Sequence, residues 1–479
     1  MASFQEMLWA WPASTLEKYA WRAFHWSRDL SPLPDALAAR FPRGFAWGAA
    51  TASYQIEGST AADGRRPSIW DTFSHTLGRT RNGETGDTAC DHYRRWSEDV
   101  DLMADLGLRA YRFSIAWPRV QPDADGRVNE RGLDFYDHLV DALLARGIEP
   151  FVTLYHWDLP QALEELGGWR DPEIVRRFAE YASTVARRLG DRVRHWLTLN
   201  EPQVFSVLGY AFGHHAPGLR DWRAALLVAH HAHLAHGAAA QALRREVPGA
   251  RVGLALNLVR YEPASQQPAD LAAADRVDGT SNRWFLDPVF GRGYPADVTD
   301  LFGDLLDGLD LDAVRSLSAP DLLGINYYTR ELVRAADDAS DPARAAIVRP
   351  AVPRTTMGWE VYPEGLRLTL ERVHRQYAPA SIVISENGAA YPDLAGADGS
   401  VSDPERTAYL ASHIAAVADA RDGGVPVDGY FVWSLLDNYE WAEGYGQRFG
   451  LVRVDYETQR RTVKESGSWY RELLAAAPR

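Results

Sequence analysis

Cysteine is almost absent from this chain. Cys90 is the single cysteine among 479 residues, so the sequence excludes both an intrachain disulfide and a cluster of thiolate metal ligands. Long apolar runs are absent too, since none approaches the ~18 residues of a membrane-spanning helix. The N-terminus has no basic segment followed by an apolar stretch, the pattern of a signal peptide. We therefore expect a cytoplasmic protein that does not associate with membranes.

Signals for nucleic acids, nucleotides and metals are weak or missing. The net charge is −14, and no run of Lys and Arg is dense enough to follow a phosphate backbone, so nucleic acid is not an expected partner. Neither a G-x-G-x-x-G turn nor a Walker loop is present, which disfavours a Rossmann-type dehydrogenase. The cluster His230, His231, His233 and His236 would need further ligands to bind zinc, so we expect ordinary helix packing there. We predict no metal and no other cofactor.

Apolar and aromatic residues, by contrast, are abundant. The chain is 46% apolar and contains 17 Trp and 21 Tyr. Most of these rings are expected to fill a core. Flat rings also stack on the apolar faces of sugar rings, so a carbohydrate site is a second use for some of them.

The first 40 residues differ from the rest of the chain. Ser14-Thr15-Leu16-Glu17 is a capping box, apolar residues then recur at helical spacing, and Ser31-Pro32-Leu33-Pro34 ends the segment. We predict a Trp-rich helical extension over residues 1–40, docked on a catalytic domain that spans residues 41–479. A contact between subunits and a cover over the site are alternative roles for this extension.

From residue 41 onward, short β-prone runs alternate with helical patterns. The predicted strands lie near residues 45–53, 110–116, 150–155, 195–200, 252–257, 322–328, 382–385 and 430–435. The helical patterns include residues 91–106, 129–146, 172–189, 224–246, 363–377 and 403–419. Eight strands separated by helices predict an α/β fold, a single (β/α)8 TIM barrel with extended loops at its C-terminal face. The alternation alone also allows a doubly wound sheet.

Three stretches between these elements are predicted to be long surface loops. They lie at residues 262–280, 335–350 and 389–402, and each is rich in Asp, Ala, Pro or Gly. Loops of this kind at the rim of a barrel are expected to set specificity.

Polar side chains stand at the C-terminal ends of the predicted strands. Asn200-Glu201-Pro202 ends the fourth strand, because proline cannot donate to a sheet ladder, and Glu386 follows the seventh. A closed parallel barrel would bring the two glutamates together, because all its strand C-termini open on one face. Further residues in or just after these strands are Gln55, Arg112, His156, Asn326, Tyr328, Trp433, Glu440 and Trp441. Their recurrence indicates a ring of hydrogen-bonding groups around one cavity.

Six stretches resemble the motifs of family 1 glycoside hydrolases, the group of retaining β-glucosidases. They are FAWGAATASYQIEG (45–58), YHWDLP (155–160), TLNEP (198–202), GINYY (324–328), SENG (385–388) and DNYEWAEGY (437–445). The matches follow the order of the family and cover about residues 41–470. The resemblance implies the barrel fold and a retaining β-glycosidase that acts on small carbohydrates.

The resemblance also implies a double-displacement mechanism. Glu386 would be the nucleophile that forms a covalent glycosyl-enzyme, and Glu201 would protonate the leaving oxygen and then deprotonate the incoming water. The two carboxyl groups of retaining enzymes lie roughly 5–5.5 Å apart, and their pKa values must differ. Arg112 and Tyr328 match the positions that hold the carboxylate of the nucleophile.

The remaining matches imply contacts with the sugar. The substrate-binding positions are Gln55, His156, Asn200, Asn326, Tyr328, Trp359, Trp433, Glu440, Trp441 and Phe449. Asn200 would take the 2-hydroxyl, Trp433 would be the stacking floor, and Trp359 the wall beside the leaving group. Relatives that cleave 6-phospho-sugars carry Ser in place of Glu440, and Lys and Tyr in place of Gln447 and Phe449. A neutral, unphosphorylated sugar is therefore favoured here, since a glutamate repels phosphate.

We expect hydrolysis of terminal, non-reducing β-D-glucosyl residues of O-glycosides. β-Glucosides and cello-oligosaccharides are the predicted substrates, accompanied by β-galactosides and β-fucosides. Two alternatives stay open: a transglycosidase that uses the same intermediate, and a catalytically silent sugar-binding protein. The sequence allows either a monomer or a homo-oligomer.

Overall fold

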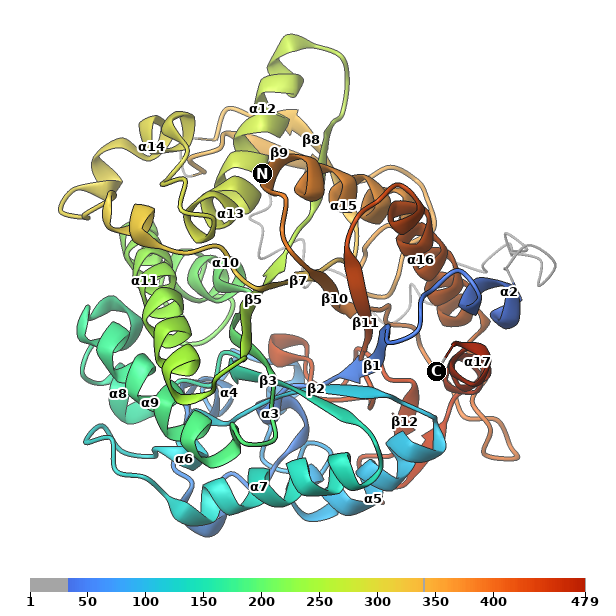
Figure 1. The fold of residues 1–479 in the computed structure, drawn as a ribbon. Helices are drawn as coiled ribbons and strands as arrows, with labels where there is room; N and C mark the ends of the chain where they lie inside the picture. Colours follow the sequence, from blue (N-terminus) through green and yellow to red (C-terminus); the bar gives the residue numbers. More distant parts are fainter. Residues whose placement is uncertain (1–32, 339–340, 479) are drawn as a thin grey trace.

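The computed structural model describes residues 33–338 and 341–478, in which eight parallel strands close into a barrel. Around the barrel the order is β1-β11-β10-β7-β5-β4-β3-β2 (Figure 1). The strands are β1 (Ala46–Ala50), β2 (Ala110–Ser114), β3 (Glu149–Tyr155), β4 (His195–Asn200), β5 (Arg251–Asn257), β7 (Leu322–Asn326), β10 (Ile382–Asn387) and β11 (Val427–Trp433). Each overlaps one of the eight predicted strands. The predicted (β/α)8 barrel is confirmed, and a doubly wound sheet is excluded because that sheet is open.

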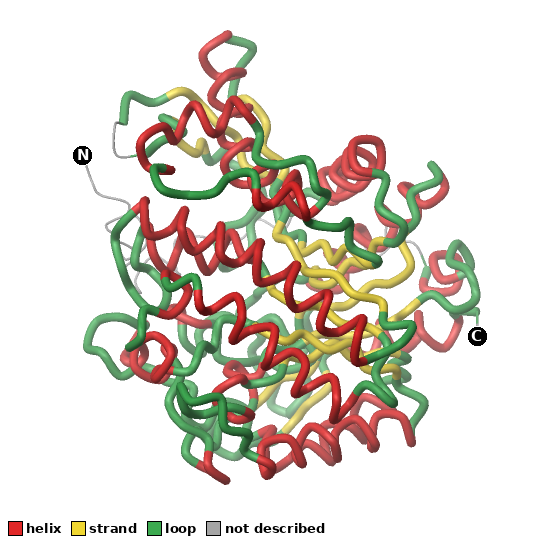
Figure 2. Tube along the Cα trace, turned by 60° about the vertical axis from the view of Figure 1, so that its left-hand side comes forward, coloured by secondary structure: helices red, strands yellow, loops and turns green. Residues whose placement is uncertain are grey.

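Helices form an outer layer around the barrel, as the ribbon of Figure 1 and the tube of Figure 2 show. The long ones are α5 (His92–Asp105), α7 (Glu130–Ala145), α9 (Glu173–Leu189), α11 (Trp222–Glu246), α15 (Pro363–Tyr377), α16 (Pro404–Asp422) and α17 (Glu465–Ala476). All but α17 match predicted helical patterns. At the start of α11, the Asp221 side chain accepts from the backbone N–H groups of Arg223 and Ala224, which satisfies two donors at the helix end. Among the described residues, no helix has the length and apolar character needed to span a membrane.

The barrel strands are buried on both faces. Every residue of β2, β7 and β10 is buried, because helices cover the strands from outside and side chains fill the interior. This explains why the strands read as continuous apolar runs in the sequence. Polar residues also occur at the N-terminal ends, such as Glu149, His195 and Arg251, but the amide and carboxyl groups that end β4, β7 and β10 stand out because they follow buried, mostly apolar runs.

Two of the three predicted surface loops contain regular structure, and the loop prediction is wrong there. The stretch 262–280 contains α12 (Pro268–Asp278), and the stretch 335–350 contains β9 (Ala345–Val348). β9 pairs with β8 (Arg330–Ala335), which also pairs with β6 (Arg260–Pro263). A small second core between α12 and β8 consists of Ala273, Ala274 and Val333. Because this core has only a few apolar residues, the polar composition of the stretch gave no sign of it. The third stretch, 389–402, has only an isolated bridge between Ala395 and Val401.

The structure describes only the last part of the predicted N-terminal extension. α2 (Pro34–Ala38) buries Leu37 and Ala38 in the main core, where the helix packs against α16 and α17. Arg40 forms ion pairs with Asp419 and Asp422 of α16. The helix predicted after the capping box lies outside the described residues, so the extension over 1–40 stays a prediction.

A group of six charged side chains joins the loops after β10 and β11 to the start of α17. We call this group the ionic cluster; its members are Asp393, Asp403, Arg406, Asp437, Arg448 and Lys464. Lys464 Nζ lies 2.6 Å from Asp437 Oδ1 and also donates to Asp393. Arg448 Nη1 lies 2.7 Å from Asp437 Oδ2, and Arg406 pairs with Asp393 and Asp403. Three cations thus face three carboxylates close to the loop that carries Glu440 and Trp441.

Candidate active site

Glu201 and Glu386 meet at the C-terminal mouth of the barrel, as predicted from their places after two different strands. Both are buried, with 4% and 3% of their surface exposed. Asn326, at the end of β7, donates from Nδ2 to Glu201 Oε1 at 2.7 Å. Burial raises the pKa of both glutamates, and hydrogen bonding to Asn326 partly offsets the rise in each. One amide group therefore lies between the two carboxyl groups.

Glu386 is held at both of its oxygens. Arg112, on β2, donates from Nη1 to Glu386 Oε1 at 2.6 Å. The Tyr328 hydroxyl, just beyond β7, donates to Glu386 Oε2 at 2.6 Å. A buried cation and a phenol donor both favour the ionised carboxylate.

The two glutamates differ in electrostatic environment. Burial raises the pKa of Glu201 to about 8, and the negative charge of Glu386 adds to the rise. Burial also raises the pKa of Glu386, but Arg112 and the Tyr328 hydroxyl oppose that rise. Since the cation contacts Glu386, we place the negative charge of the pair there and the proton on Glu201.

Asn200 fixes the hydrogen on His156. The Asn200 Oδ1 atom accepts from Arg112 at 2.6 Å and from Asn326 at 3.1 Å, so this end of the amide must be the oxygen. Its Nδ2 then donates to His156 Nε2 at 2.9 Å. Burial holds the pKa of His156 well below its usual value, so the ring is neutral and carries its hydrogen on Nδ1. That Nδ1 atom is buried without a partner, and it is a donor ready for a ligand.

Gln55 presents the complementary group. Its Nε2 lies 2.9 Å from the Tyr439 carbonyl, 3.0 Å from Asn438 Oδ1 and 3.3 Å from Glu440 Oε2. Three acceptors around Nε2 orient the amide, and Oε1 is left buried without a partner. Burial, and then the charge of Glu386, raise the pKa of Glu440 to about 8. A donor on His156 and an acceptor on Gln55 together suit hydroxyl groups, which both accept and donate.

Aromatic rings surround these polar groups. The Trp433 ring, at the end of β11, lies 5.9 Å from that of His156, and the Trp441 ring lies at the same distance from His156. Trp359 packs at 5.0 Å from Tyr328, with Phe449 6.2 Å from Tyr328. Every side chain predicted for the site thus belongs to one connected group around Glu201 and Glu386.

The sequence missed several residues that support the site. Thr153 accepts from Arg112 Nε at 3.1 Å, and Ser385 donates to Asn326 Oδ1 at 2.6 Å. Burial raises the pKa of Glu201, and a hydrogen bond from Asn257 offsets part of that rise. Asn257 is the last residue of β5, so the rule that polar residues mark strand ends would have found it. Thr153 and Ser385 lie inside apolar strands and give no such signal.

The four histidines of α11 do not belong to the site. His230 and His233 contact the Tyr294 hydroxyl through Nδ1, at 3.1 and 3.0 Å, and His236 Nδ1 contacts Thr198 Oγ1 at 2.7 Å. Burial lowers the pKa of all four, so they are neutral packing groups. Within residues 33–338 and 341–478, no group of three or more His, Cys, Asp or Glu side chains could hold a metal ion.

A closed (β/α)8 barrel with two buried carboxyl groups and unpartnered hydroxyl-binding atoms at its C-terminal mouth defines a barrel glycosidase. The sequence model of glycosyl hydrolase family 1 matches residues 37–478. The chain belongs to this family, whose members are retaining glycosidases.

Relatives cover nearly all of the chain. It is 48% identical to beta-glucosidase A of Thermotoga maritima over 437 residues, 91% of this chain and 98% of the relative. A bifunctional beta-D-glucosidase/beta-D-fucosidase of Bifidobacterium breve is 46% identical, with the same two coverages. The solved structure of the Thermotoga maritima beta-glucosidase in complex with glucoimidazole has a TM-score of 0.88 and 47% identity, over 92% of this chain and 99% of the other.

Proposed function

We propose that this protein is a retaining β-glucosidase that removes terminal β-D-glucosyl residues from neutral O-glycosides, including cello-oligosaccharides. The observation that carries the proposal is the unequal support of the two carboxyl groups. Glu386 contacts a guanidinium and a phenol, whereas Glu201 contacts amide groups and has a pKa raised to about 8. One carboxylate is poised to attack while the other still holds a proton.

In the first step Glu386 attacks the anomeric carbon and Glu201 donates its proton to the leaving oxygen. The glycosidic bond breaks as the ester to Glu386 forms, and the aglycone leaves as a neutral alcohol. Arg112 keeps the attacking carboxylate ionised and oriented. His156 and Gln55 hold hydroxyl groups of the sugar through their unpartnered atoms, and Trp433 is the floor on which the sugar ring lies.

In the second step Glu201 acts as the base. Once Glu386 is an ester, its negative charge is gone, and that charge is one of the causes that raise the pKa of Glu201. Glu201 therefore gives up its proton more readily in the intermediate than in the free enzyme. It then takes a proton from water, which attacks the anomeric carbon and releases the sugar with its configuration retained.

The choice of sugar is supported by Glu440 and by the relatives. A carboxyl group beside Gln55 suits sugar hydroxyls and disfavours a phosphate. One relative is named a 1,4-beta-D-glucan glucohydrolase, which supports cello-oligosaccharides, and another is named for both glucosidase and fucosidase activity. We extend the proposal to β-fucosides and β-galactosides as secondary substrates.

The test is mass spectrometry of the intact protein after incubation with a 2-deoxy-2-fluoro-β-glucoside that has a good leaving group. We expect one added sugar, located on Glu386 by peptide mapping, and slow recovery of the free enzyme. Cleavage of plain β-glucosides without any adduct would contradict the covalent mechanism. An adduct on another residue would contradict the choice of nucleophile.

A further inference from the structure

Three neighbouring strands of the barrel are joined at their C-terminal ends by one chain of hydrogen bonds. Ser53, just after β1, accepts at Oγ from the Ser114 hydroxyl of β2 at 3.0 Å. The backbone N–H of Ser53 donates to Ser114 Oγ at 2.7 Å. The Ser53 hydroxyl then donates to Asp158 Oδ2, just after β3, at 2.7 Å. The hydroxyl of Ser114 donates to Ser53, and that of Ser53 donates to Asp158, so Asp158 is the final acceptor of this series of hydrogen bonds.

Asp158 has an unusual environment for a carboxyl group. It is fully buried, and its Oδ1 atom has no hydrogen-bond partner. Among the described residues, Arg65 is a cation close enough to lower the pKa of Asp158, but its guanidinium pairs with Asp71 at 2.9 Å and not with Asp158. Burial raises the pKa of Asp158 to about 7, and the charge of Glu57 adds to the rise. A buried carboxyl group without a cation costs stability, so packing alone does not explain why it is an aspartate.

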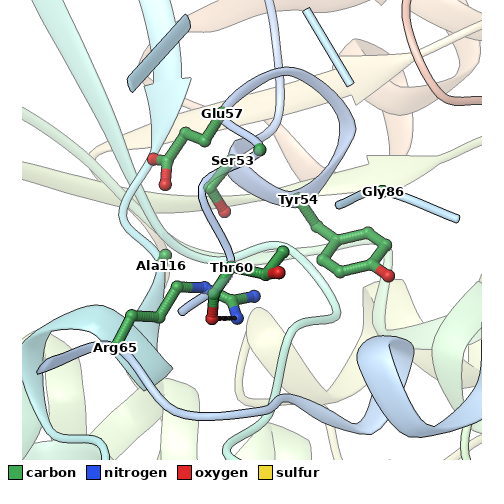
Figure 3. Close-up of a pocket in the computed structure, with 8 residues that line it drawn as sticks. Ser53, Tyr54, Glu57, Thr60, Arg65, Gly86 and Ala116 are labelled. Carbon is green, nitrogen blue, oxygen red and sulfur yellow. Dashed lines mark hydrogen bonds between the residues drawn. The ribbon is translucent and has the colours of Figure 1, made fainter. Parts of the chain in front are cut away.

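A small gap between side chains lies beside Ser53, the first residue of the buried helix α3 (Ser53–Ile56). Its walls include Ser53, Tyr54, Glu57, Thr60 and Arg65 (Figure 3). In this view Ser53 and Tyr54 lie on the helical coil of α3, and Arg65 donates to the Thr60 carbonyl at 2.8 Å.

The turn that leads to Asp158 is also restrained. The backbone of Trp157 has φ of +79°, a conformation that residues other than glycine rarely adopt. The Trp157 Nε1 atom donates to the Asn200 carbonyl at 2.9 Å. The turn is therefore held by Trp157 on one side and by Asp158 on the other. His156, whose Nδ1 atom is unpartnered, is the residue that enters this turn.

We propose that Asp158 is a positioning residue for hydrolysis: by accepting from Ser53 it fixes Gln55 and His156 relative to each other, so that both bind hydroxyl groups of one sugar ring. Gln55 stands two residues after Ser53, and His156 two residues before Asp158. The Ser53–Asp158 hydrogen bond is the direct link between these two segments. Asp158 itself touches neither the substrate nor Glu201 and Glu386. The inference rests on the proposed function, since it requires a sugar in this site.

The test compares Ser53→Ala, Asp158→Leu and Asp158→Asn with the wild type on an aryl β-glucoside and on its 3-deoxy, 4-deoxy and 6-deoxy analogues. A misplacement of about 1 Å costs roughly 100-fold in rate. We therefore expect Asp158→Leu to lose ~10- to 100-fold in kcat/KM on the parent glucoside, mostly through KM. Asp158→Asn keeps an oxygen that accepts from Ser53, so it should recover most of this loss.

The deoxy analogues separate positioning from a general structural role. An analogue that lacks the hydroxyl bound by Gln55 and His156 should be a poor substrate of the wild type, and the variants should lower its kcat/KM much less than that of the parent. Equal losses on all four substrates would overturn the proposal, as would full activity of Ser53→Ala. If Asp158→Leu does not fold, Ser53→Ala carries the same comparison.

A matched control is Ser183→Ala. Ser183, on α9, is buried and donates to the carboxylate of Glu246 at 2.6 Å, outside the barrel mouth. This variant should leave kcat/KM unchanged on every substrate. An inactive wild type would count against the proposed function itself. An active wild type with equal losses in the variants would count only against the role of Asp158.

Discussion

The active site and the ionic cluster are two buried polar regions built on opposite principles. At the active site one guanidinium, Arg112, lies among three carboxyl groups, and burial raises the pKa of Glu201 and Glu440 to about 8. In the ionic cluster three cations face three carboxylates. There, Lys464 and Arg448 overcome the effect of burial and hold the pKa of Asp437 below its usual value.

The difference also appears in the hydrogen bonds. Gln55 Oε1 and His156 Nδ1 are buried at the site without partners, whereas none of the six ionic-cluster side chains, all of them in the described chain, has an unpartnered buried atom. Incomplete pairing leaves atoms free to bind a substrate and raises the pKa of Glu201 and Glu440, at a cost in stability. Complete pairing fixes the loops that surround the site. Substitutions should therefore affect activity in the first region and stability in the second.

The largest effect is expected for Glu386→Gln, which removes the charge that, in our proposal, attacks the sugar. Loss of a catalytic nucleophile lowers kcat by roughly 10⁶-fold in other enzymes, and we expect a loss of this order on an aryl β-glucoside. Arg112 keeps its contacts with Asn200, Thr153 and the Ser385 carbonyl, so the melting temperature should change less than in any variant of Lys464. A larger fall in melting temperature than that of Lys464→Met would break the comparison.

Glu201→Ala should have the next largest effect on activity. Loss of a general acid–base group costs about 10²- to 10⁴-fold, and the loss should be greatest for glucosides with poor leaving groups. In the wild type, kcat/KM should fall as pH rises through about 8, because free Glu201 then loses the proton that the leaving oxygen needs. This basic limb should vanish in Glu201→Ala. If it persists, Glu440 is the group that titrates there.

Lys464→Met should act in the opposite way. It leaves Asp393 and Asp437 buried with fewer cations, and breaking a buried pair costs about 3–5 kcal/mol. We expect that loss in urea unfolding, with KM little changed in the protein that remains folded. The control is Arg127→Ala, since the pair with Asp125 is exposed and such pairs contribute about 0–1 kcal/mol. Equal stability of the two variants would contradict the assigned role of the ionic cluster.

Much of the barrel and of the site followed from the sequence because parallel barrel strands are buried on both faces. An apolar run that ends in Asn200-Glu201-Pro202 or in Glu386-Asn387-Gly388 shows both the strand and the functional residue at its end. The strand positions agree with the structure because each strand is mostly apolar, although Arg112, Thr153 and Thr198 interrupt the pattern within β2, β3 and β4.

Local patterns were less informative where stability comes from distant contacts. Ala273 and Ala274 of α12 pack against Val333. The amino-acid composition of the stretch does not reveal this contact and predicts a loop. The role of Asp158 depends on Ser53, about a hundred residues earlier, and on strand order. Thr153 and Ser385 look like ordinary strand residues. Only the folded barrel brings Thr153 to Arg112 and the Ser385 hydroxyl to Asn326.

Arg112 also determines by which route substrate and product enter and leave the site. From β2 it reaches side chains on β3, β4 and β10, and so spans the interior directly beneath the two carboxyl groups. A barrel interior filled in this way has no rear exit. The released sugar must leave by the same opening through which the next substrate enters, and it leaves last, after the aglycone. Product and substrate therefore use the same opening of the pocket. The rate at which the monosaccharide dissociates is an upper limit for kcat.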